Sequence, residues 1–509
     1  MLTIHFETLG CKLNQIETES IARFCTDAGF QATMAHSTAS QAETTPVLSI
    51  INTCTVTAKA EQKARRIIRM LLAKFPCSAV LVTGCYAQVE KAQIEQIDSR
   101  IAVVPGTAKD MLAEFPRFFM EMLSKEKLPE TAEEAAAVAE VIKSWAELHI
   151  QAAEQAQAQP MQDAQANNRL KPPAALKAQT SINAQDFATV NKFRLATDSF
   201  MHHSRGSIKI QDGCSNRCAY CRICIARGKS VSLEPAEVLK RVRAIEASGQ
   251  AEIVITGVNL TLYRGTLNQD GAEKPMDFAE LLQYLLENTS TVSFRISSLY
   301  PERVDDALCK VIAHERVRPH FHLSVQSGSN AILKAMHRPY TAETVVAAVE
   351  KLRQVKQNPF IACDIIAGFP GETDEDFEQT KELCNKCKFT YVHAFPFSPR
   401  PGTEAYTMKN QVPQRIAGER VKWLSDFARA SKAEYAKAFE GKILKAVVEK
   451  RESNIGKAVT ENFLHIYIEE NKQTLKQLAG KEIPVLIKHA LDITGKDEET
   501  EATAAFAES

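Results

Sequence analysis

The chain has 509 residues, 45% of them hydrophobic and 24% charged, which is the composition of a globular protein with more than one domain. Lysine plus arginine equals aspartate plus glutamate at 62 each, so overall charge argues neither for nor against a nucleic-acid partner. The amino terminus lacks a secretory signal, and no apolar stretch approaches the roughly 18 residues of a membrane span. Together with 13 cysteines, this predicts a cytoplasmic protein with no membrane partner, in a reducing compartment where thiols serve metals or cores.

The first 127 residues alternate between apolar runs and helical patterns. Buried strands are predicted at 2–8, 47–53, 79–83 and 101–104. Such alternation is typical of a doubly wound parallel sheet. We therefore predict an amino-terminal α/β domain over residues 1–127.

Residues 128–195 differ in composition from both of their flanks. Alanine and glutamine dominate the segment, and aromatic residues are nearly absent from it. A segment with so little apolar surface predicts a mobile linker or insertion that is partly helical at best.

A second α/β region is predicted over residues 196–440. Its candidate strands lie at 207–211, 252–257, 292–297, 321–325, 360–367 and 391–397, with helical patterns between them. These βα-like units suggest a partial (β/α)6 barrel, which places reactive groups at the carboxyl ends of its strands. A short all-β region is expected at 441–493, and the acidic composition of 494–509 predicts a disordered tail.

Three cysteines are closely spaced after the first strand of that second region. Cys214, Cys218 and Cys221 form a C-x3-C-x2-C run. Three thiolates on so short a loop can hold three corners of a cubane iron–sulfur cluster and leave the fourth iron without a protein ligand. An electron carrier normally closes that position with a fourth cysteine. The spacing therefore favours chemistry performed at a cluster over simple electron transfer.

A second set of cysteines follows three of the amino-terminal strands. Cys11, Cys54 and Cys85 each come just past the carboxyl end of a predicted parallel strand. These ends share one edge of a doubly wound sheet, so cysteines distant in sequence can meet there. Buried cysteines also serve simply as small apolar residues, but three at equivalent strand ends favour a shared metal site.

Together, the two cysteine sets identify a resemblance. The C-x3-C-x2-C run after a strand resembles radical S-adenosylmethionine enzymes, and the segments Gly10–Gln15, Asn52–Thr55 and Gly84–Gln88 resemble the methylthiotransferases among them. Further stretches similar to that family are Ile255–Asn259, Arg295–Ser298, His322–Ser329, Asp364–Thr373 and Phe395–Thr403. The likeness covers about 1–125 and 200–490. One departure is Cys224, at a position where many relatives carry proline.

Within the family, the segments Gly10–Gln15 and Gln211–Cys214 most resemble the branch that acts on N6-threonylcarbamoyladenosine in tRNA. The resemblance implies methylthiolation at C2 of that nucleoside next to the anticodon. It also implies two 4Fe-4S clusters, one on Cys214, Cys218 and Cys221 that cleaves S-adenosylmethionine to a radical, and one on Cys11, Cys54 and Cys85 that delivers sulfur. A second S-adenosylmethionine would supply the methyl group.

The resemblance also implies binding residues and partners. Contacts to S-adenosylmethionine are expected at four strand-end positions, Gly257, Ser298, Gln326 and Asp364, although a turn or cap explains each about as well. The implied partners are the tRNA anticodon loop, a reductase or flavodoxin-type electron donor, and a sulfur donor.

Two regions are candidates for contact with RNA. Six basic residues on the predicted helix after Cys54 could form a patch for the tRNA backbone, or simply a solvated face: Lys59, Lys63, Arg65, Arg66, Arg69 and Lys74. The region 441–493 resembles a TRAM domain, a small RNA-binding β-barrel. There Phe463, His465 and Tyr467 alternate with apolar residues, as expected for a strand with one face that stacks bases or for one buried on both faces.

Other functions fit parts of these patterns. The same chemistry could act on isopentenyladenosine in tRNA or on a side chain of a ribosomal protein. A protein of a different class, which binds RNA and carries an iron–sulfur cluster without catalysis, would also contain such cysteines.

Overall fold

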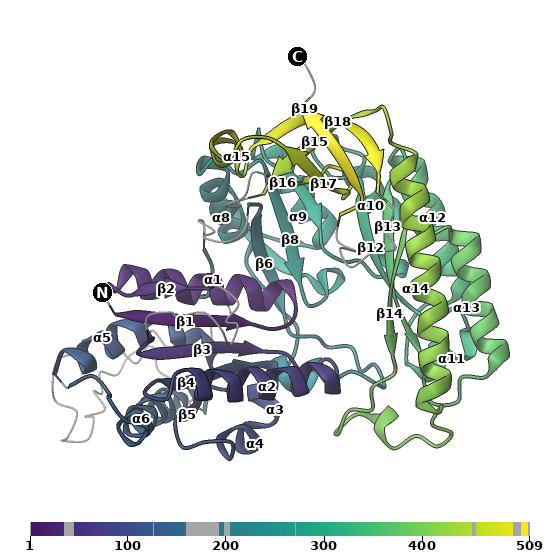
Figure 1. Cartoon of the computed structure of the whole chain (residues 1–509). Coiled ribbons are helices and arrows are strands. Elements are labelled where there is room, and N and C mark those ends of the chain that lie inside the picture. The colour runs from purple at the N-terminus through teal and green to yellow at the C-terminus, as the bar shows by residue number, and fades with distance from the viewer. Residues whose placement is uncertain are drawn as a thin grey trace. The chain divides into compact units, whose positions relative to one another are not determined.

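The computed structural model describes residues 2–34, 45–125, 127–158, 193–197, 204–269, 271–449, 455–491 and 500–506 (Figure 1). By their internal contacts these residues divide into two compact units. The first unit comprises Met1–Leu9, Ser20–Cys54 and Glu61–Leu195. The second unit comprises Gly10–Glu19, Thr55–Ala60 and Ala196–Ser509.

A five-stranded parallel sheet forms the centre of the first unit, with the strand order β2-β1-β3-β4-β5. Its strands are β1 (Thr3–Thr8), β2 (Gln31–Thr33), β3 (Leu48–Thr53), β4 (Ala79–Gly84) and β5 (Ile101–Val103). The doubly wound sheet predicted from the sequence is confirmed. Edge strand β2 was not predicted, because three residues are too few to show a period. After β1 the chain adds β2 on one side of it and then β3 on the other side. Doubly wound folds bind ligands at such a switch point, which here lies between β1 and β3.

Helices of the amino-terminal part follow the strands. They are α1 (Lys12–Asp27), α2 (Ala58–Lys74), α3 (Cys85–Val89), α4 (Lys91–Glu95) and α5 (Phe115–Lys125), with a 3-10 helix at Lys109–Ala113. Helix α2 buries Ala64, Ile68 and Leu71 in one apolar core with residues of β3 and β4. This spacing of four and three residues places the apolar side chains on one face of the helix.

Helix α6 (Ala132–Ala158) occupies much of the segment that composition predicted to be a linker, helical at best in part. It packs against β4 and β5, and the Trp145 ring stacks on Phe118 with 5.5 Å between centroids. Alanine has the highest helix propensity, and Ala135, Ala139 and Ile142 recur at helical spacing on the buried side. The prediction did not count alanine among the residues that can pack closely against a core. The remainder of the predicted insertion, 159–192, lies outside the described residues.

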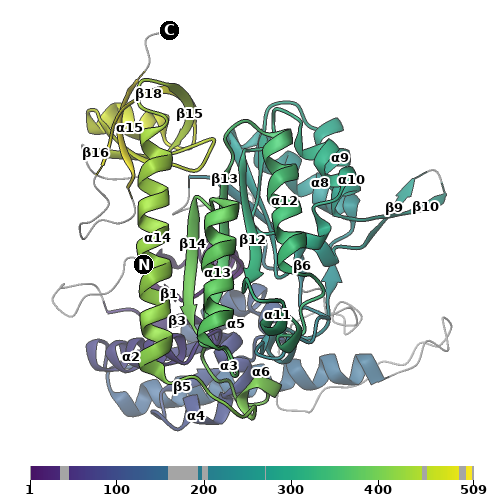
Figure 2. The same ribbon diagram turned by 90° about the vertical axis from the view of Figure 1, so that its right-hand side faces the viewer.

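The second unit contains the predicted partial barrel. Its parallel strands are β6 (Gly206–Asp212), β8 (Glu252–Gly257), β11 (Ser293–Ile296), β12 (His320–Gln326), β13 (Phe360–Ala367) and β14 (Tyr391–Pro396). The strands form two sheets, β11-β8-β6-β7 and β12-β13-β14. Isolated parallel bridges connect the two sheets, from Phe294 of β11 to Val317 and from Leu299 to Leu323 of β12. Figure 2 shows β12, β13 and β14 side by side.

Helices separate the barrel strands as expected. They are α7 (Ile223–Arg227), α8 (Pro235–Ala247), α9 (Phe278–Glu287), α10 (Asp306–Ile312), α11 (Asn330–Ala335), α12 (Ala342–Val355), α13 (Asp374–Cys387) and α14 (Gln414–Lys437). Helix α13 begins with a side-chain cap, because the Thr373 side chain accepts a hydrogen bond from the backbone N–H of Asp376. Strand β7 (Val231–Ser232) and the hairpin β9 (Gly265–Gln269) and β10 (Ala272–Met276) were not predicted.

A closed barrel of five strands ends the second unit, in the order β15-β16-β17-β19-β18. The strands are β15 (Ile443–Val448), β16 (Ile455–Thr460), β17 (His465–Glu469), β18 (Glu482–Ala490) and β19 (Ala502–Phe506), with helix α15 (Lys472–Leu478) between β17 and β18. The expectation of a disordered tail over 494–509 is wrong for Ala502–Phe506. This strand follows the acidic run and closes the barrel by pairing with β17 and β18. Residues 492–499 lie outside the described residues.

The predicted alternation in β17 is confirmed on its inner face, where Leu464, Ile466 and Ile468 are buried in the barrel core. Phe463 does not form an open stacking face for bases. Its ring lies 4.0 Å from the His320 ring and 5.6 Å from that of Phe360, between centroids, so it packs against strands of the partial barrel.

A buried ion cluster joins the partial barrel to the closed barrel within the second unit. Glu252 accepts two hydrogen bonds of 2.7 Å from Arg295, whose Nη2 also donates to the Thr460 carbonyl at 3.1 Å. Arg318 contacts Glu252 and also pairs with Glu482 of β18. Burial alone raises the pKa of Glu252, but Arg295 and its other arginine neighbours hold that pKa at about 2, below the ordinary 4.5.

Replacing Arg295 by methionine is expected to destabilise the second unit by about 3–5 kcal/mol, because it leaves the buried Glu252 carboxylate without its main partner. Since folding lowers the pKa of Glu252, its stabilising effect is complete above about pH 4.5 and is lost as the pH falls toward 2. Thermal unfolding of wild type and variant across this pH range measures both effects. Arg303→Met, at an exposed arginine, is the control and should change stability by no more than about 0.5 kcal/mol. Equal melting temperatures for all three proteins would contradict a role for the ion cluster.

No helix among the described residues is long and apolar enough to cross a membrane.

Candidate active site

The three closely spaced cysteines lie in the loop between β6 and α7. Cys214 is buried, while Cys218 and Cys221 are partly exposed. Gly213 begins the loop with φ +69°, and a Cβ there would lie 2.0 Å from the Lys229 carbonyl oxygen. Only glycine fits this position, because a side chain would push the two arms of the loop apart.

Gln211, at the end of β6, fixes the start of this loop from a fully buried position. Its Nε2 donates to the Gly213 carbonyl at 2.7 Å and to Ser230 Oγ at 2.8 Å. Its Oε1 accepts from the Asn259 backbone N–H at 2.8 Å. One amide side chain therefore ties the cysteine loop to the end of the neighbouring strand β8.

The cysteine thiols influence one another, which indicates that they lie close together. The pKa of Cys221 is raised to about 12, chiefly by burial, with smaller rises from the nearby Cys218 and Cys214 and opposition from the N–H of Ile223. Arg338 Nη1 lies 3.2 Å from Cys218 Sγ. Neighbouring thiols beside a guanidinium suit an anionic iron–sulfur cluster, since bound iron would replace the protons and Arg338 would compensate the added charge.

Cys224, the departure from the family pattern, lies on α7 beside this loop. Its Sγ is 4.0 Å from the Cys221 carbonyl oxygen. Among the described residues, no three His, Cys, Asp or Glu side chains are arranged around a single metal ion. A cubane takes each cysteine on a different iron, so it does not need ligands converging on one point.

A buried network of ions anchors both ends of the cysteine loop. Arg227 Nη1 lies 3.0 Å from Asp212 Oδ1 and 3.2 Å from Glu17 Oε1, and Lys209 Nζ bridges the same two carboxylates at 3.0 and 3.1 Å. Arg227 Nη2 also donates to Asn14 Oδ1 at 2.7 Å. The network fastens the Gly10–Glu19 segment to the loop within the second unit.

Two of the other three cysteines belong to the first unit. Cys54 directly follows β3 and Cys85 directly follows β4, and these strands are neighbours in register, with Thr53 opposite Gly84. Both thiols are buried. Cys11 is exposed, lies two residues after Leu9 and is counted in the second unit by its contacts.

Three of the four predicted contacts of S-adenosylmethionine lie at or just after the carboxyl ends of barrel strands, whereas the expected strand-end position of Asp364 is wrong. Gly257 ends β8, where a Cβ would lie 3.0 Å from Gln211, and Ser298 follows β11 with partial exposure. Gln326 ends β12 with φ +71°, a conformation that costs a non-glycine residue about 1–2 kcal/mol. Asp364 lies in the middle of β13, and its Oδ1 is 3.0 Å from His322 Nε2.

Sequence reasoning did not find Arg338, His322 or His393 as site residues. Arg338 is more than 100 positions from Cys218, and no local motif distinguishes it from other arginines. The two histidines come together with Asp364 only when β12, β13 and β14 pair. In the sequence, the one signal for His322 and His393 as residues of a polar face was that each alternates with apolar residues along its strand.

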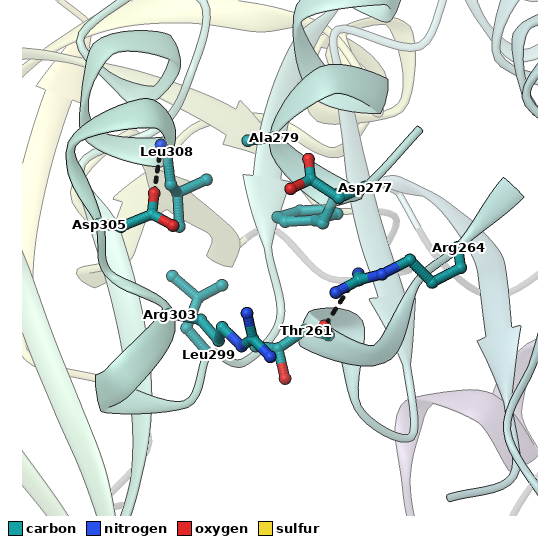
Figure 3. A pocket seen from close by; sticks show the side chains of 9 residues that line it. Thr261, Arg264, Asp277, Ala279, Leu299, Arg303, Asp305 and Leu308 are labelled. Atoms are coloured by element: carbon teal, nitrogen blue, oxygen red, sulfur yellow. Dashed lines mark hydrogen bonds between the residues drawn. The ribbon is translucent and has the colours of Figure 1, made fainter. Parts of the chain in front are cut away.

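A small pocket elsewhere in the second unit is lined by Thr261, Arg264, Asp277, Phe278, Ala279, Leu299, Arg303, Asp305 and Leu308 (Figure 3). Its two carboxylates already serve as helix caps, since Asp277 accepts from the Glu280 N–H and Asp305 from the Leu308 N–H. Arg264 donates to the Thr261 carbonyl at 3.4 Å. With both carboxylates committed to caps, the pocket offers no group for catalysis.

The fold and the cysteine loop define a radical SAM enzyme. A family model described as the radical SAM superfamily matches residues 208–384, and one described as uncharacterized protein family UPF0004 matches residues 3–106. Among solved structures, the radical S-adenosylmethionine methyltransferase TsrM from Kitasatospora setae is 15% identical with a TM-score of 0.48, over 80% of this chain and 77% of that one.

Curated relatives specify the family. The chain is 44% identical over 476 residues to threonylcarbamoyladenosine tRNA methylthiotransferase MtaB of Treponema pallidum, covering 92% of this chain and 95% of that protein. It is 30% identical to the Bacillus subtilis protein of the same name, over 95% of this chain and 94% of that protein. A tRNA-2-methylthio-N(6)-dimethylallyladenosine synthase of Carboxydothermus hydrogenoformans is also 30% identical, over 87% of each chain.

The chain therefore belongs to the MtaB-type tRNA methylthiotransferases of the radical SAM superfamily. It is a transferase, and its cofactors are S-adenosylmethionine and two [4Fe-4S] clusters.

Proposed function

We propose that this enzyme replaces the C2 hydrogen of N6-threonylcarbamoyladenosine, next to the tRNA anticodon, with a methylthio group. The main support is that one chain contains both the cysteine loop after β6 and strand-end cysteines after β3 and β4. This chain is also 44% identical, over 92% of its length, to a protein named for this reaction. In the overall change a C–H bond at C2 breaks, a C–S bond forms, and a methyl group is added to the sulfur.

The two cysteine sets have separate roles in this proposal. Cys214, Cys218 and Cys221 hold the cluster that, with S-adenosylmethionine, supplies the radical needed to break an unactivated C–H bond. Cys11, Cys54 and Cys85 hold the second cluster, where sulfur is supplied. Arg338 stabilises the anionic cluster beside Cys218, and Gln211 together with the Arg227 network keeps the loop in place.

The cofactor contacts follow from the positions of the strand ends. Gly257, Ser298, Gln326 and Asp364 contact S-adenosylmethionine in this proposal, and the first three lie as expected for the carboxyl edge of a barrel. The left-handed backbone at Gln326 supports its role, because strained non-glycine residues concentrate at ligand sites. Gly257 acts by absence of a side chain, since it leaves room for the Gln211 amide.

The remaining partners follow from the reaction. Radical formation consumes an electron, which a reductase or flavodoxin-type donor supplies, and each turnover consumes sulfur, which a separate donor restores. Both exchanges and the tRNA substrate suit a cytoplasmic enzyme. The closed barrel of β15–β19 contributes an RNA-binding module of the TRAM kind, although Phe463 packs against the partial barrel instead of a base.

A basic face on helix α2 is suited to bind the tRNA backbone. Four of its six basic residues are exposed, and they share one side of the helix: Lys59, Lys63, Arg66 and Arg69. The acidic residue of the helix, Glu61, is buried on another side. A face of one sign is electrostatically favourable for phosphates.

Reversing two charges on this face, with Lys63→Glu and Arg66→Glu together, is expected to weaken tRNA binding. The slope of log Kd against log salt should fall by about one for each lost phosphate contact. Fluorescence anisotropy at several salt concentrations measures both quantities. The control is the double reversal Lys240→Glu and Lys310→Glu on α8 and α10, which should leave the slope unchanged. Equal slopes in wild type and the α2 variant would remove this face from the tRNA site.

Mass spectrometry of tRNA nucleosides tests the proposed function directly. Cells without the gene should accumulate N6-threonylcarbamoyladenosine and lack its 2-methylthio derivative, and a plasmid copy should restore the derivative. Loss of methylthiolated isopentenyladenosine instead would assign the enzyme to the other tRNA branch. An unchanged nucleoside profile would leave a protein substrate or a non-catalytic role.

A further inference from the structure

Three adjacent barrel strands present a polar face that includes two histidines without a role in cofactor binding, beside Asp364. His322 of β12, Asp364 of β13 and His393 of β14 are partly exposed, whereas residues next to them in the strands, such as Leu323 and Val392, are buried. Successive side chains of a strand point to opposite faces, so the three polar residues lie on the same side of this sheet. That side is partly exposed, and the opposite side is buried.

These three side chains form an ordered group. The imidazole rings of His322 and His393 stack with 5.0 Å between centroids and 4° between planes. Asp364 Oδ1 lies 3.0 Å from His322 Nε2, and the Tyr391 ring meets His393 edge-on at 4.7 Å. Asp364 therefore fixes the orientation of His322, and stacking extends that orientation to His393.

The ionisation of the group limits what it can bind. Burial is the main cause that lowers the pKa of His393, with smaller lowering by His322 and Lys432 and opposition from Asp364, and the result is a pKa of about 4, so His393 is neutral near pH 7. A neutral imidazole has one donor nitrogen and one acceptor nitrogen. Burial raises the pKa of Asp364, but the neighbouring His322, His393 and Arg338 outweigh this and lower it, so the carboxylate is ionised.

The group lies close to the cysteine loop along strand β12. Arg338, which contacts Cys218, also donates through Nη2 to the Ser324 carbonyl at 3.3 Å. His322 is two residues from Ser324, which is about 7 Å along an extended strand. A substrate that places its reacting atom near the cluster loop can therefore extend a substituent a few ångströms long onto this face.

We propose that the stacked pair His322 and His393 binds the polar N6 substituent of the target adenosine and gives the enzyme its preference for that substituent. This inference rests on the proposed function and deepens it. A threonylcarbamoyl group carries N–H donors, a carbonyl oxygen, a hydroxyl group and a carboxylate. Its N–H and O–H groups can donate to Asp364 and to acceptor nitrogens of the imidazoles, and N–H groups of the imidazoles can donate to the carbonyl oxygen and the carboxylate. A hydrocarbon substituent would instead cover the imidazoles and Asp364 without offering them hydrogen-bond partners. This costs roughly 1–3 kcal/mol of binding free energy for each polar group left unpaired. The same face therefore selects against an isopentenyl group.

His393→Phe tests the proposal, because phenylalanine keeps a ring for the contacts with His322 and Tyr391 but removes both nitrogens. Binding of the holoenzyme to anticodon stem-loops with N6-threonylcarbamoyladenosine, isopentenyladenosine or unmodified adenosine is measured by anisotropy. The variant should bind the threonylcarbamoyl stem-loop about tenfold more weakly, as expected for the loss of one or two hydrogen bonds. Its affinity for the isopentenyl stem-loop should be unchanged or improved.

The ratio of the two affinities is the decisive quantity, since a general structural defect would weaken both. His489→Phe, at an exposed histidine of β18, is the control and should keep the wild-type ratio. A wild-type ratio in His393→Phe would overturn the inference while leaving the proposed function intact. Failure of the wild-type enzyme itself to prefer or modify the threonylcarbamoyl stem-loop would instead overturn the proposed function.

Discussion

Cys218→Ala is expected to abolish the formation of 5′-deoxyadenosine from S-adenosylmethionine by the reduced, anaerobically reconstituted enzyme. Cys218 is one of three cysteines on the loop after β6, and Arg338 compensates charge at this thiol in particular. With two thiolates left on the loop, a cubane loses one of its three protein corners. Chromatographic measurement of 5′-deoxyadenosine, together with iron content, follows the loss.

Cys224→Ala is the matched control for this prediction. Its thiol lies beside the same loop, 4.0 Å from the Cys221 carbonyl oxygen, but falls outside the C-x3-C-x2-C spacing. The variant should keep its iron and most of its 5′-deoxyadenosine formation. If Cys224→Ala were inactive and Cys218→Ala active, the ligand set on this loop would have to be reassigned.

Cys54→Ala is expected to separate radical formation from product formation. Cys54 and Cys85 follow adjacent strands of the first unit, whereas the cysteine loop for which we propose the S-adenosylmethionine role lies in the second unit. Damage to the strand-end set should therefore leave 5′-deoxyadenosine formation near the wild-type rate and reduce methylthiolated nucleoside to background. Both products are quantified from the same reaction by mass spectrometry.

Cys77→Ala is the control for loss of a thiol in the first unit. Cys77 donates to the Glu130 carbonyl at 2.9 Å and has no place at a strand end, so both products should persist. Full product formation by Cys54→Ala would remove this residue from the sulfur-supplying site. Loss of both products would show that the two cysteine sets do not act separately.

The barrel and the doubly wound sheet could be predicted because their strands are short apolar runs separated by helical periods. Each of the predicted strands in the first unit is present within a residue or two of its expected bounds. Strand β19 could not be predicted, since it follows an acidic run and gains its partners only from β17 and β18 of the folded barrel. Helix α6 was predicted as a linker, helical at best in part, because its composition offers little apolar surface. Its alanines nevertheless favour a helix and allow it to pack closely.

The cysteine loop could be found from spacing, whereas its supporting residues could not. No sequence motif used above pointed to Arg227, and the structure places it in a buried network with Asp212 and Glu17. Arg338 contacts the Cys218 thiol although the two residues are far apart in the sequence. The His393 ring stacks on the His322 ring although their strands, β14 and β12, are separated by β13. Such contacts depend on the register between distant strands, which no local pattern specifies.

The central claim is that one chain carries two iron–sulfur clusters, each held by three cysteines. Iron analysis of three anaerobically reconstituted proteins tests it most directly: the wild type, the triple alanine variant at Cys214, Cys218 and Cys221, and the triple variant at Cys11, Cys54 and Cys85. The account predicts about eight iron atoms in the wild type and about four in each variant, since a cubane contains four. About four iron atoms in the wild type, with none left in one of the variants, would contradict it.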